Sequence, residues 1–188
     1  MRKAAKIIGI IAGVIIVIVI ISVLASPGEE ETKPFSEQDV TPQTVQAALD
    51  DVSGTSVELG DCITDIQVLS NAGTDNPNDF IVHVYFKPES IWDEEDAVQT
   101  AVQSSIKAME ILFQNESISE VAMWEQLEFT DEYGDTETET AVRITMTDTV
   151  ADQVVSWETV SDRAWSDYTS FFDLADLEYM HPAIAKEL

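Results

Sequence analysis

The apolar positions of the chain form one long uninterrupted run and then become periodic. The 19 residues from Ile7 to Ala25 carry no charge. As a helix they would span about 28 Å, close to a hydrocarbon core of about 30 Å. A secretory signal has a shorter apolar region of about 7 to 15 residues, although Val23 and Ala25 before Ser26 satisfy a cleavage site. The pattern predicts a transmembrane anchor at residues 1–25, with a cleaved or uncleaved signal as the alternative.

Charges on either side of the apolar run predict its orientation. Three basic residues precede it and an acidic stretch follows it. By the positive-inside rule the amino terminus is cytoplasmic and the rest of the chain extracytoplasmic, which predicts a single-pass protein of the cell membrane. Ala5, Gly9 and Gly13 have the small-residue spacing of a transmembrane dimer seam. Glycine is common in membrane helices, so this seam is only a candidate.

Residues 26–40 and 41–52 predict a linker followed by a helix. The first range contains two prolines, one glycine and five acidic residues, which indicates an extended acidic linker. In the second range Thr41 is the expected N-cap and Pro42 the first helical residue. The apolar residues on one face of this expected helix are Val45, Ala48, Leu49 and Val52.

Strand pairs and further helices follow. Residues 56–70 and 80–87 predict two antiparallel strands, and residues 93–114 predict a long amphipathic helix with acidic residues in its first turn. Residues 119–129 and 138–147 alternate apolar and polar positions around a turn, which predicts a second hairpin. Two helical stretches are expected after Asp148, the second over residues 159–173.

The fold class expected from this order is α+β. Helix, two strands, helix, two strands and helix pack most economically as one four-stranded antiparallel sheet of two hairpins, covered by helices on one face. The sequence therefore predicts a transmembrane helix followed by one extracytoplasmic domain at residues 41–188.

The charge of the chain excludes one class of partner. All 36 acidic residues but only six of the nine basic ones follow Ala25, so that part carries a formal charge of −30 (6 − 36). Nucleic acid binding needs clustered basic residues, so no nucleic acid partner is expected. Self-repulsion at this charge is screened in concentrated salt, which predicts a protein of a halophile. The alternative is an acidic or cation-collecting domain at ordinary ionic strength.

Reactive constellations are not evident in the sequence. Ser104 and Lys107 have the Ser-x-x-Lys spacing, but its companion motifs are absent and the pair falls in the middle of a helix. The single cysteine, Cys62, excludes an intrachain disulfide and is expected as a small hydrophobe in a strand. We therefore predict no catalytic and no cofactor-binding residue, and a protein that is not an enzyme.

Metal binding is a weak hypothesis. His83 and His181 are far apart in sequence and do not have a metal-ligand spacing. Two loops offer oxygen ligands of the kind that Ca²⁺ prefers, but neither matches an EF-hand, and carboxylates cluster by chance in so acidic a chain. The candidate calcium ligands are Asp75, Asp79, Asp131 and Asp135.

Aromatic residues and one sequon supply the remaining candidates. Trp92, Trp124 and Trp165 are candidates for a partner surface, because exposed aromatics among carboxylates suit a cationic ligand or a protein. The alternative for the aromatics is the core. Asn115 begins an Asn-Glu-Ser glycosylation sequon at the expected end of the long helix.

The function expected from these observations is a membrane-anchored, non-catalytic interaction or binding module of a halophile, such as a subunit of an envelope assembly. Its expected partners are the membrane and another envelope protein or a second copy. The alternative is a solute- or cation-binding envelope domain, which a concave pocket lined by tryptophan and carboxylates would favour. An envelope hydrolase ranks third, and a buried carboxylate pair in a cleft would favour it.

Overall fold

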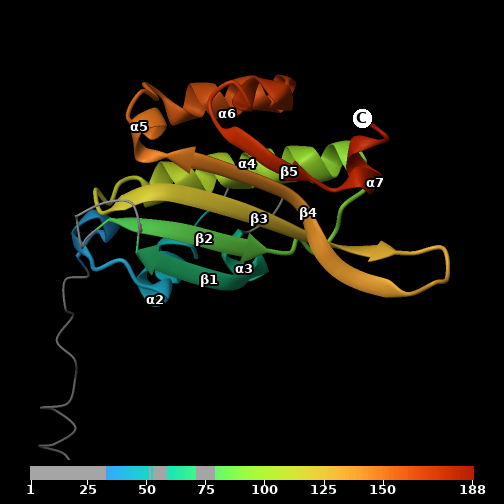
Figure 1. The fold of residues 1–188 in the computed structure, drawn as a ribbon. Coiled ribbons are helices and arrows are strands. Elements are labelled where there is room, and N and C mark those ends of the chain that lie inside the picture. The colour runs from blue at the N-terminus through green and yellow to red at the C-terminus, as the bar shows by residue number, and fades with distance from the viewer. Residues whose placement is uncertain (1–32, 51, 53–58, 71–78) are drawn as a thin grey trace, which may run out of the picture. The chain divides into compact units, whose positions relative to one another are not determined.

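The computed structural model describes residues 33–50, 52, 59–70 and 79–188. They form an α+β domain around a five-stranded sheet with the order β1-β2-β3-β4-β5 (Figure 1). Three neighbouring pairs are antiparallel, whereas β2 and β3 are parallel. The strands are β1 (Ile63–Ser70), β2 (Phe80–Phe86), β3 (Ile118–Thr130), β4 (Thr136–Thr147) and β5 (Asp176–Met180).

The parallel pair corrects the predicted antiparallel sheet. Both hairpins are present, but helix α4 (Glu94–Leu112) connects them. Its 19 residues cover about 28 Å and return the chain to the end of the sheet at which β2 began. Strand β3 must therefore run in the same direction as β2, because a crossover of this length joins parallel neighbours.

The fifth strand is the second correction. The range predicted as one helix, 159–173, contains the end of α6 (Trp157–Ser166) and the 3₁₀ helix η2 (Tyr168–Phe171). Strand β5 then pairs with β4 at the sheet edge, and α7 (Pro182–Ala185) ends the fold. Four of the five β5 residues are exposed, so this strand has no buried alternation to signal it.

The expected first hairpin is confirmed, but its first strand begins later than predicted. Residues Leu59–Cys62 form the short helix α3, and β1 begins at Ile63. The prediction that Cys62 lies in a strand is therefore wrong. Its side chain is buried in the core region, as expected for a small hydrophobe.

Both predicted amphipathic helices are present. Helix α2 (Pro42–Leu49) begins with a capping box in which Thr41 and Thr44 bond each other's backbone N–H. Helix α4 begins after Asp93, whose Oδ1 accepts the N–H of Asp96 at 2.9 Å. The core forms between these helices and one face of the sheet, and its largest buried side chains include Phe86, Leu49, Ile106, Met109 and Ile144.

The two faces of the sheet differ in their cover. Helices α4, α5 (Asp148–Ala151) and α6 lie on the same side of the sheet in Figure 1. The residues of β2 that point to this side, Val82, Val84 and Phe86, are completely buried. Their neighbours His83 and Tyr85 point to the other face and are half-buried.

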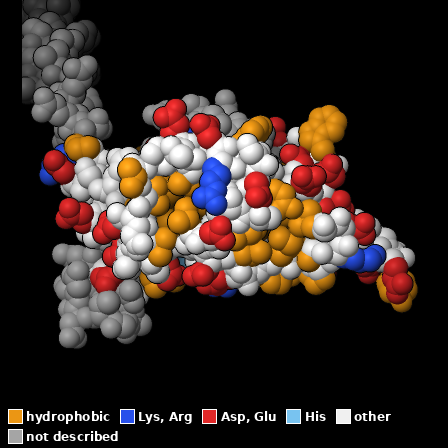
Figure 2. All heavy atoms as spheres, turned by 90° about the horizontal axis from the view of Figure 1, so that it is seen from above, with side chains coloured by type: hydrophobic (Ala, Val, Ile, Leu, Met, Phe, Trp, Pro, Cys, Tyr) orange, Lys and Arg blue, Asp and Glu red, His pale blue; other side chains and the backbone are white. Residues whose placement is uncertain are grey.

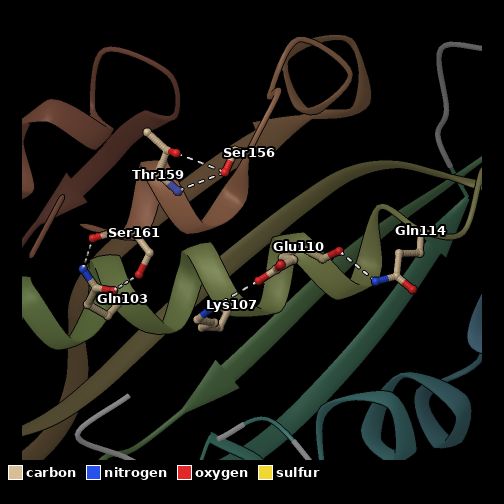
Figure 3. A network of polar contacts seen from close by, with 7 residues as sticks. All are labelled: Gln103, Lys107, Glu110, Gln114, Ser156, Thr159 and Ser161. Atoms are coloured by element: carbon tan, nitrogen blue, oxygen red, sulfur yellow. Dashed lines mark hydrogen bonds and ion pairs between the residues drawn. The ribbon is translucent and has the colours of Figure 1, made fainter. Parts of the chain in front are cut away.

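Helix α6 is joined to α4 by a reciprocal pair of hydrogen bonds (Figure 3). The Gln103 amide donates to the Ser161 carbonyl at 3.3 Å and accepts from the Ser161 hydroxyl at 2.8 Å. Gln103 is only 4% exposed. The buried amide is thus satisfied by α6 itself, which fixes the position of α6 along α4.

Residues before α2 also belong to this domain. The 3₁₀ helix η1 spans Phe35–Glu37, and Val40 is buried in the core. Asn115, at the end of α4, donates from Nδ2 to the carbonyls of Phe35 and Gln38 at 2.8 and 2.9 Å. The compact unit accordingly begins at Pro34, within the range predicted as linker.

The predicted transmembrane part of the fold is also corrected. Among the described residues, no helix has the length and apolar character needed to cross a membrane. The predicted anchor at residues 1–25 and the candidate seam of Ala5, Gly9 and Gly13 lie outside the described residues. The predicted membrane partner, single-pass localisation and topology all depend on that anchor, and the described residues give them no support.

Candidate binding groove

A groove opens where β2 ends, α4 begins and α7 crosses the far end of β3. Its volume is about 660 Å³. The segment from Lys87 to Glu94 lines one side of it, and the rest of the lining comes from Leu127, Glu128 and Phe129 of β3 and from Ala183 and Ile184 of α7. Three stretches of chain that are far apart in sequence therefore contribute to a single concavity.

Hydrogen bonds at the start of α4 position Trp92 at the groove. The Asp96 carboxylate accepts the backbone N–H of Trp92 at 2.9 Å, and Asp93 caps the helix directly after it. These two hydrogen bonds fix the backbone of the loop, while Trp92 remains 90% exposed. An indole this exposed contributes nothing to the core, although it lies beside an apolar surface.

The apolar floor of the groove comes from alternation along β3. Val121 and Met123 point into the core, and Leu127 and Phe129 continue the same face beyond the part covered by α4. Ile91 before α4 and Ile184 of α7 add apolar surface to this floor. The core face of the sheet thus emerges as the floor of an open groove.

Carboxylates dominate the rim. Glu89, Asp93 and Glu94 line the groove on the α4 side, and Glu128 lines it on the β3 side. Lys87 is the one basic residue among the described residues of the lining, and its Nζ lies 2.7 Å from Glu128. The hydrogen bond from Lys87, followed by its charge, lowers the pKa of the exposed Glu128 carboxyl. With that pair neutralised, the remaining charge of the rim is negative.

A second, more acidic hollow continues from the groove through Phe129 and Ala183, which line both. Its volume is about 430 Å³. The His181 ring stacks on Phe129 with 3.8 Å between centroids, and its Nε2 lies 3.5 Å from Glu139. The other acidic residues of its lining are Asp131, Asp135 and Glu137.

The surface view shows the same mixture of side chains. Figure 2 presents the face seen from above in Figure 1, on which hydrophobic patches lie between many acidic side chains and few basic ones. A ligand that meets such a surface encounters negative charge around apolar area. The groove combines these two properties in a concave form.

One carboxyl group lies behind the groove floor. Glu125 is 0% exposed, and neither of its carboxyl oxygens has a hydrogen-bond partner. Burial, followed by the negative charge of Asp96, raises the pKa of Glu125 well above its usual range. Leu127, the next residue on the same face of β3, lines the groove. Glu125 does not itself line it.

The opposite face of the sheet carries an aromatic and cationic row. Tyr85 stacks on Trp124 with 5.2 Å between centroids, and the Arg143 guanidinium lies 4.3 Å from the centre of the Trp124 ring. Arg143 also pairs with Glu178 of β5. Burial, followed by the charge of Arg143, lowers the pKa of His83. The charge of Glu120 acts in the opposite direction and raises it. These contacts hold the half-buried side chains against the sheet.

No family model, no curated protein and no solved structure matches this chain. The site is therefore interpreted from its own geometry.

The structure separates the three tryptophans predicted as a partner surface. Trp92 lies at the groove, Trp124 lies on the opposite face of the sheet, and Trp165 projects from α6 with 63% of its side chain exposed. Most of the other carboxyl-terminal aromatics pack against the core. Of the three candidates, Trp92 combines high exposure with a place in the groove lining.

Sequence reasoning missed the rest of the groove. Residues 80–87 indicated only a strand, and residues 119–129 indicated only a strand with alternating apolar and polar positions. The signal that was available is the unusual segment Glu89 to Glu94, in which Ile91 and Trp92 stand between carboxylates just before a helix. That Ile184, about 90 residues further along, lies beside this segment can be seen only in the folded structure.

The candidate calcium ligands do not form a cluster in the described part of the chain. There, no group of three or more His, Cys, Asp and Glu side chains is arranged for a metal ion. Asp131 Oδ1 accepts the backbone N–H groups of Tyr133 and Asp135 at 2.8 and 2.9 Å, which organises the hairpin tip. Asp75 lies outside the described residues, and Asp79 begins the next described range.

The other candidate residues have structural contacts. Asn115 is only 2% exposed, although the end of a helix is usually accessible. Its amide donates to two backbone carbonyls. Glycosylation of Asn115 stays a prediction. Ser104 is completely buried within α4, and Lys107 lies 3.3 Å from Glu110. The Ser104 hydroxyl and the Lys107 amine are therefore not presented to solvent as a pair.

Proposed function

We propose that the domain is a non-catalytic binding module that holds a basic, partly apolar peptide segment of a protein partner in the groove beside Trp92. The ligand's apolar side chains would rest on Leu127, Phe129 and Ile184. Its lysine or arginine side chains would meet Trp92 and the rim carboxylates. Neither the partner's identity nor its location in the cell enters this proposal.

The observation that carries the proposal is the 90% exposed Trp92 at an apolar groove with an acidic rim. A cation over an indole face is stabilised by the ring quadrupole, and Trp is the best of the aromatic residues for this contact. Glu89, Asp93 and Glu94 add charge complementarity on the same side. Apolar floor, exposed indole and carboxylates together match a ligand that is both cationic and apolar.

The extent of the concavity favours a peptide over a small cationic solute. The groove of about 660 Å³ continues into the acidic hollow of about 430 Å³ through their common lining residues, Phe129 and Ala183. A small solute would fill one of these spaces and leave the other empty. An extended chain with alternating side chains would use both.

A hydrolase is disfavoured by the position of the buried carboxyl. Glu125 has the raised pKa of a general acid, and Asp96 is its charged neighbour. A general acid must come within hydrogen-bond reach of the reacting group. Because Glu125 is 0% exposed and lies behind the floor, a ligand in the groove does not reach it.

The first test is binding of a short synthetic peptide of alternating lysine and leucine, measured by calorimetry at several KCl concentrations. Trp92→Ala should weaken binding by about tenfold, because an exposed cation–π contact contributes about 0.5–1 kcal/mol and the indole also buries apolar area. The substitution leaves the net charge unchanged. Its effect is therefore separate from general attraction to an acidic protein.

Trp165→Ala is the matched control, since Trp165 is also highly exposed but lies on α6, away from the groove. It should leave the affinity within twofold. A glutamate–leucine peptide should not bind. Equal losses in the two tryptophan variants, or equal binding of the two peptides, would overturn the proposal.

A further inference from the structure

Glu125 is an uncompensated acid in the middle of the sheet. It lies on β3 between Phe86 of β2 and Val142 of β4. Its side chain is 0% exposed and both carboxyl oxygens have no hydrogen-bond partner. An isolated buried carboxylate is so unfavourable that the group takes up a proton instead. Burial and then the charge of Asp96 raise its pKa accordingly, which favours the neutral form of Glu125.

The charged residues around Glu125 do not offset this. Asp96, from α4, adds negative charge. Lys87, which follows Phe86, pairs with Glu128 at 2.7 Å. Arg143, which follows Val142, lies over Trp124 on the other face of the sheet and pairs with Glu178. The two cations adjacent in the sheet are thus engaged elsewhere.

The lining of the groove begins next to this acid along the chain. Leu127 is the next residue of β3 on the same face, and Ala97 follows Asp96 on α4, and both line the groove. The Asp96 carboxylate also accepts the N–H of Trp92. Asp96 therefore links the two sites. Its charge acts on Glu125 of β3, and its carboxylate holds the backbone of Trp92 at the groove.

We propose that Glu125 gives up its proton to solvent when a cationic peptide occupies the groove, so that binding is coupled to pH. This inference rests on the function proposed above. The O–H bond of the neutral carboxyl breaks, the electron pair remains on the carboxylate, and the buffer takes up the proton. The positive charge of the peptide then compensates the new negative charge of Glu125 behind the groove floor.

The physical reason is the effect of a nearby charge on an acid in a poorly solvated place. An opposite charge favours the ionised form, and screening is weak where water is excluded. Occupation of the groove by a cation therefore lowers the pKa of Glu125. Between its pKa in the complex and its higher pKa in the free protein, the affinity rises with pH. Above the free value the affinity no longer depends on Glu125.

The test measures proton release by the full-length protein with the lysine–leucine peptide. Titration calorimetry in two buffers of different ionisation enthalpy gives the number of protons released for each peptide bound. The wild type should release up to one proton, and its affinity should rise by up to tenfold for each pH unit within the window. Glu125→Gln, which mimics the neutral acid, should bind the peptide but release fewer protons. The difference should equal the number of protons that Glu125 gives up in the wild type.

A second variant keeps the test decisive if Glu125→Gln does not fold. Asp96→Asn removes the negative charge that helps to keep Glu125 protonated, while the amide oxygen can still accept the Trp92 N–H. The window of proton release should then move to lower pH. Rim carboxylates are common to the wild type and Glu125→Gln, so the difference between them isolates Glu125.

The outcomes separate the two proposals. Peptide binding with the same proton release in the wild type and Glu125→Gln would overturn the coupling and leave the binding function standing. An unshifted window in Asp96→Asn would count against it in the same way. If the peptide did not bind at any pH, the binding function would fall and the coupling with it.

Discussion

Glu125 is also the residue at which the stability of the domain should depend most clearly on pH. In the unfolded chain its carboxyl ionises near the ordinary value of 4.5, whereas in the folded protein it stays protonated to higher pH. Ionisation therefore stabilises the unfolded state relative to the folded state as the pH rises above 4.5. This penalty grows until the pH passes the pKa of the folded state, and it is then constant.

Glu125→Gln should remove that penalty because an amide does not ionise. We expect the variant to be more stable than the wild type above pH 4.5, by up to about 1.4 kcal/mol for each pH unit within the window. Near pH 4 the two proteins should have similar stability. Urea unfolding followed by circular dichroism over this range gives the difference. A gap that stays constant with pH would mean that Glu125 is ionised in the folded protein.

At the scale of elements, the contact between α4 and α6 depends on one buried amide. Gln103→Ala removes both hydrogen bonds to Ser161 and leaves its polar groups without their partner (Figure 3). Loss of stability should be about 1–3 kcal/mol, the usual cost of leaving buried polar groups unpaired. The midpoint of urea unfolding measures it.

Gln114→Ala is the control, two residues after the end of the same helix. Gln114 is exposed, and its amide bonds only the carbonyl of Glu110, one turn earlier in α4. Its substitution should change the stability by less than about 0.5 kcal/mol. Similar losses for both variants would show that the effect does not come from the contact with α6.

The sequence predicts well those elements that are determined by a local pattern of residues. Helix α2 and the start of α4 are confirmed because their caps, Thr41 and Asp93, act on backbone groups three residues away. The hairpin of β3 and β4 is confirmed because Val142, Ile144 and Met146 alternate on one face. Local patterns of this kind are complete within a short stretch of chain.

The errors concern information that is not local. The direction of β3 relative to β2 depends on how α4 lies on the sheet, which neither strand encodes. Strand β5 forms by pairing with β4, and its residues Leu177 and Tyr179 are exposed. The groove needs Trp92, Leu127 and Ile184 in one place. The sequence therefore indicated that Trp92 was a candidate, but not what lay beside it.

For the whole molecule, the excess of carboxylates should govern its response to salt. Each of the five basic side chains from Lys87 to Lys186 already lies within ion-pair distance of a carboxylate. The chain nevertheless has 36 acidic residues, and most of them repel one another across the surface. Screening shortens the reach of this repulsion from about 10 Å at 0.1 M salt to about 3 Å at 1 M.

The melting temperature should therefore rise steadily from low salt to molar KCl, as measured by scanning calorimetry. Sorbitol at matched osmolality is the control, because it is excluded from the surface without screening charge. A flat profile in KCl, or an equal rise in sorbitol, would contradict adaptation to high salt. The proposed origin in a halophile depends on this result.

The hydrogen bonds of Asn115 have a mechanical consequence. Its amide bonds the carbonyls of Phe35 and Gln38, so the amino-terminal end of the domain is fastened to the end of α4, about 80 residues further along. A pulling force applied at residue 33 would reach these two bonds before it reached the capping box of α2. The first yielding step under tension would then free residues 34–40 and leave the sheet and its groove intact.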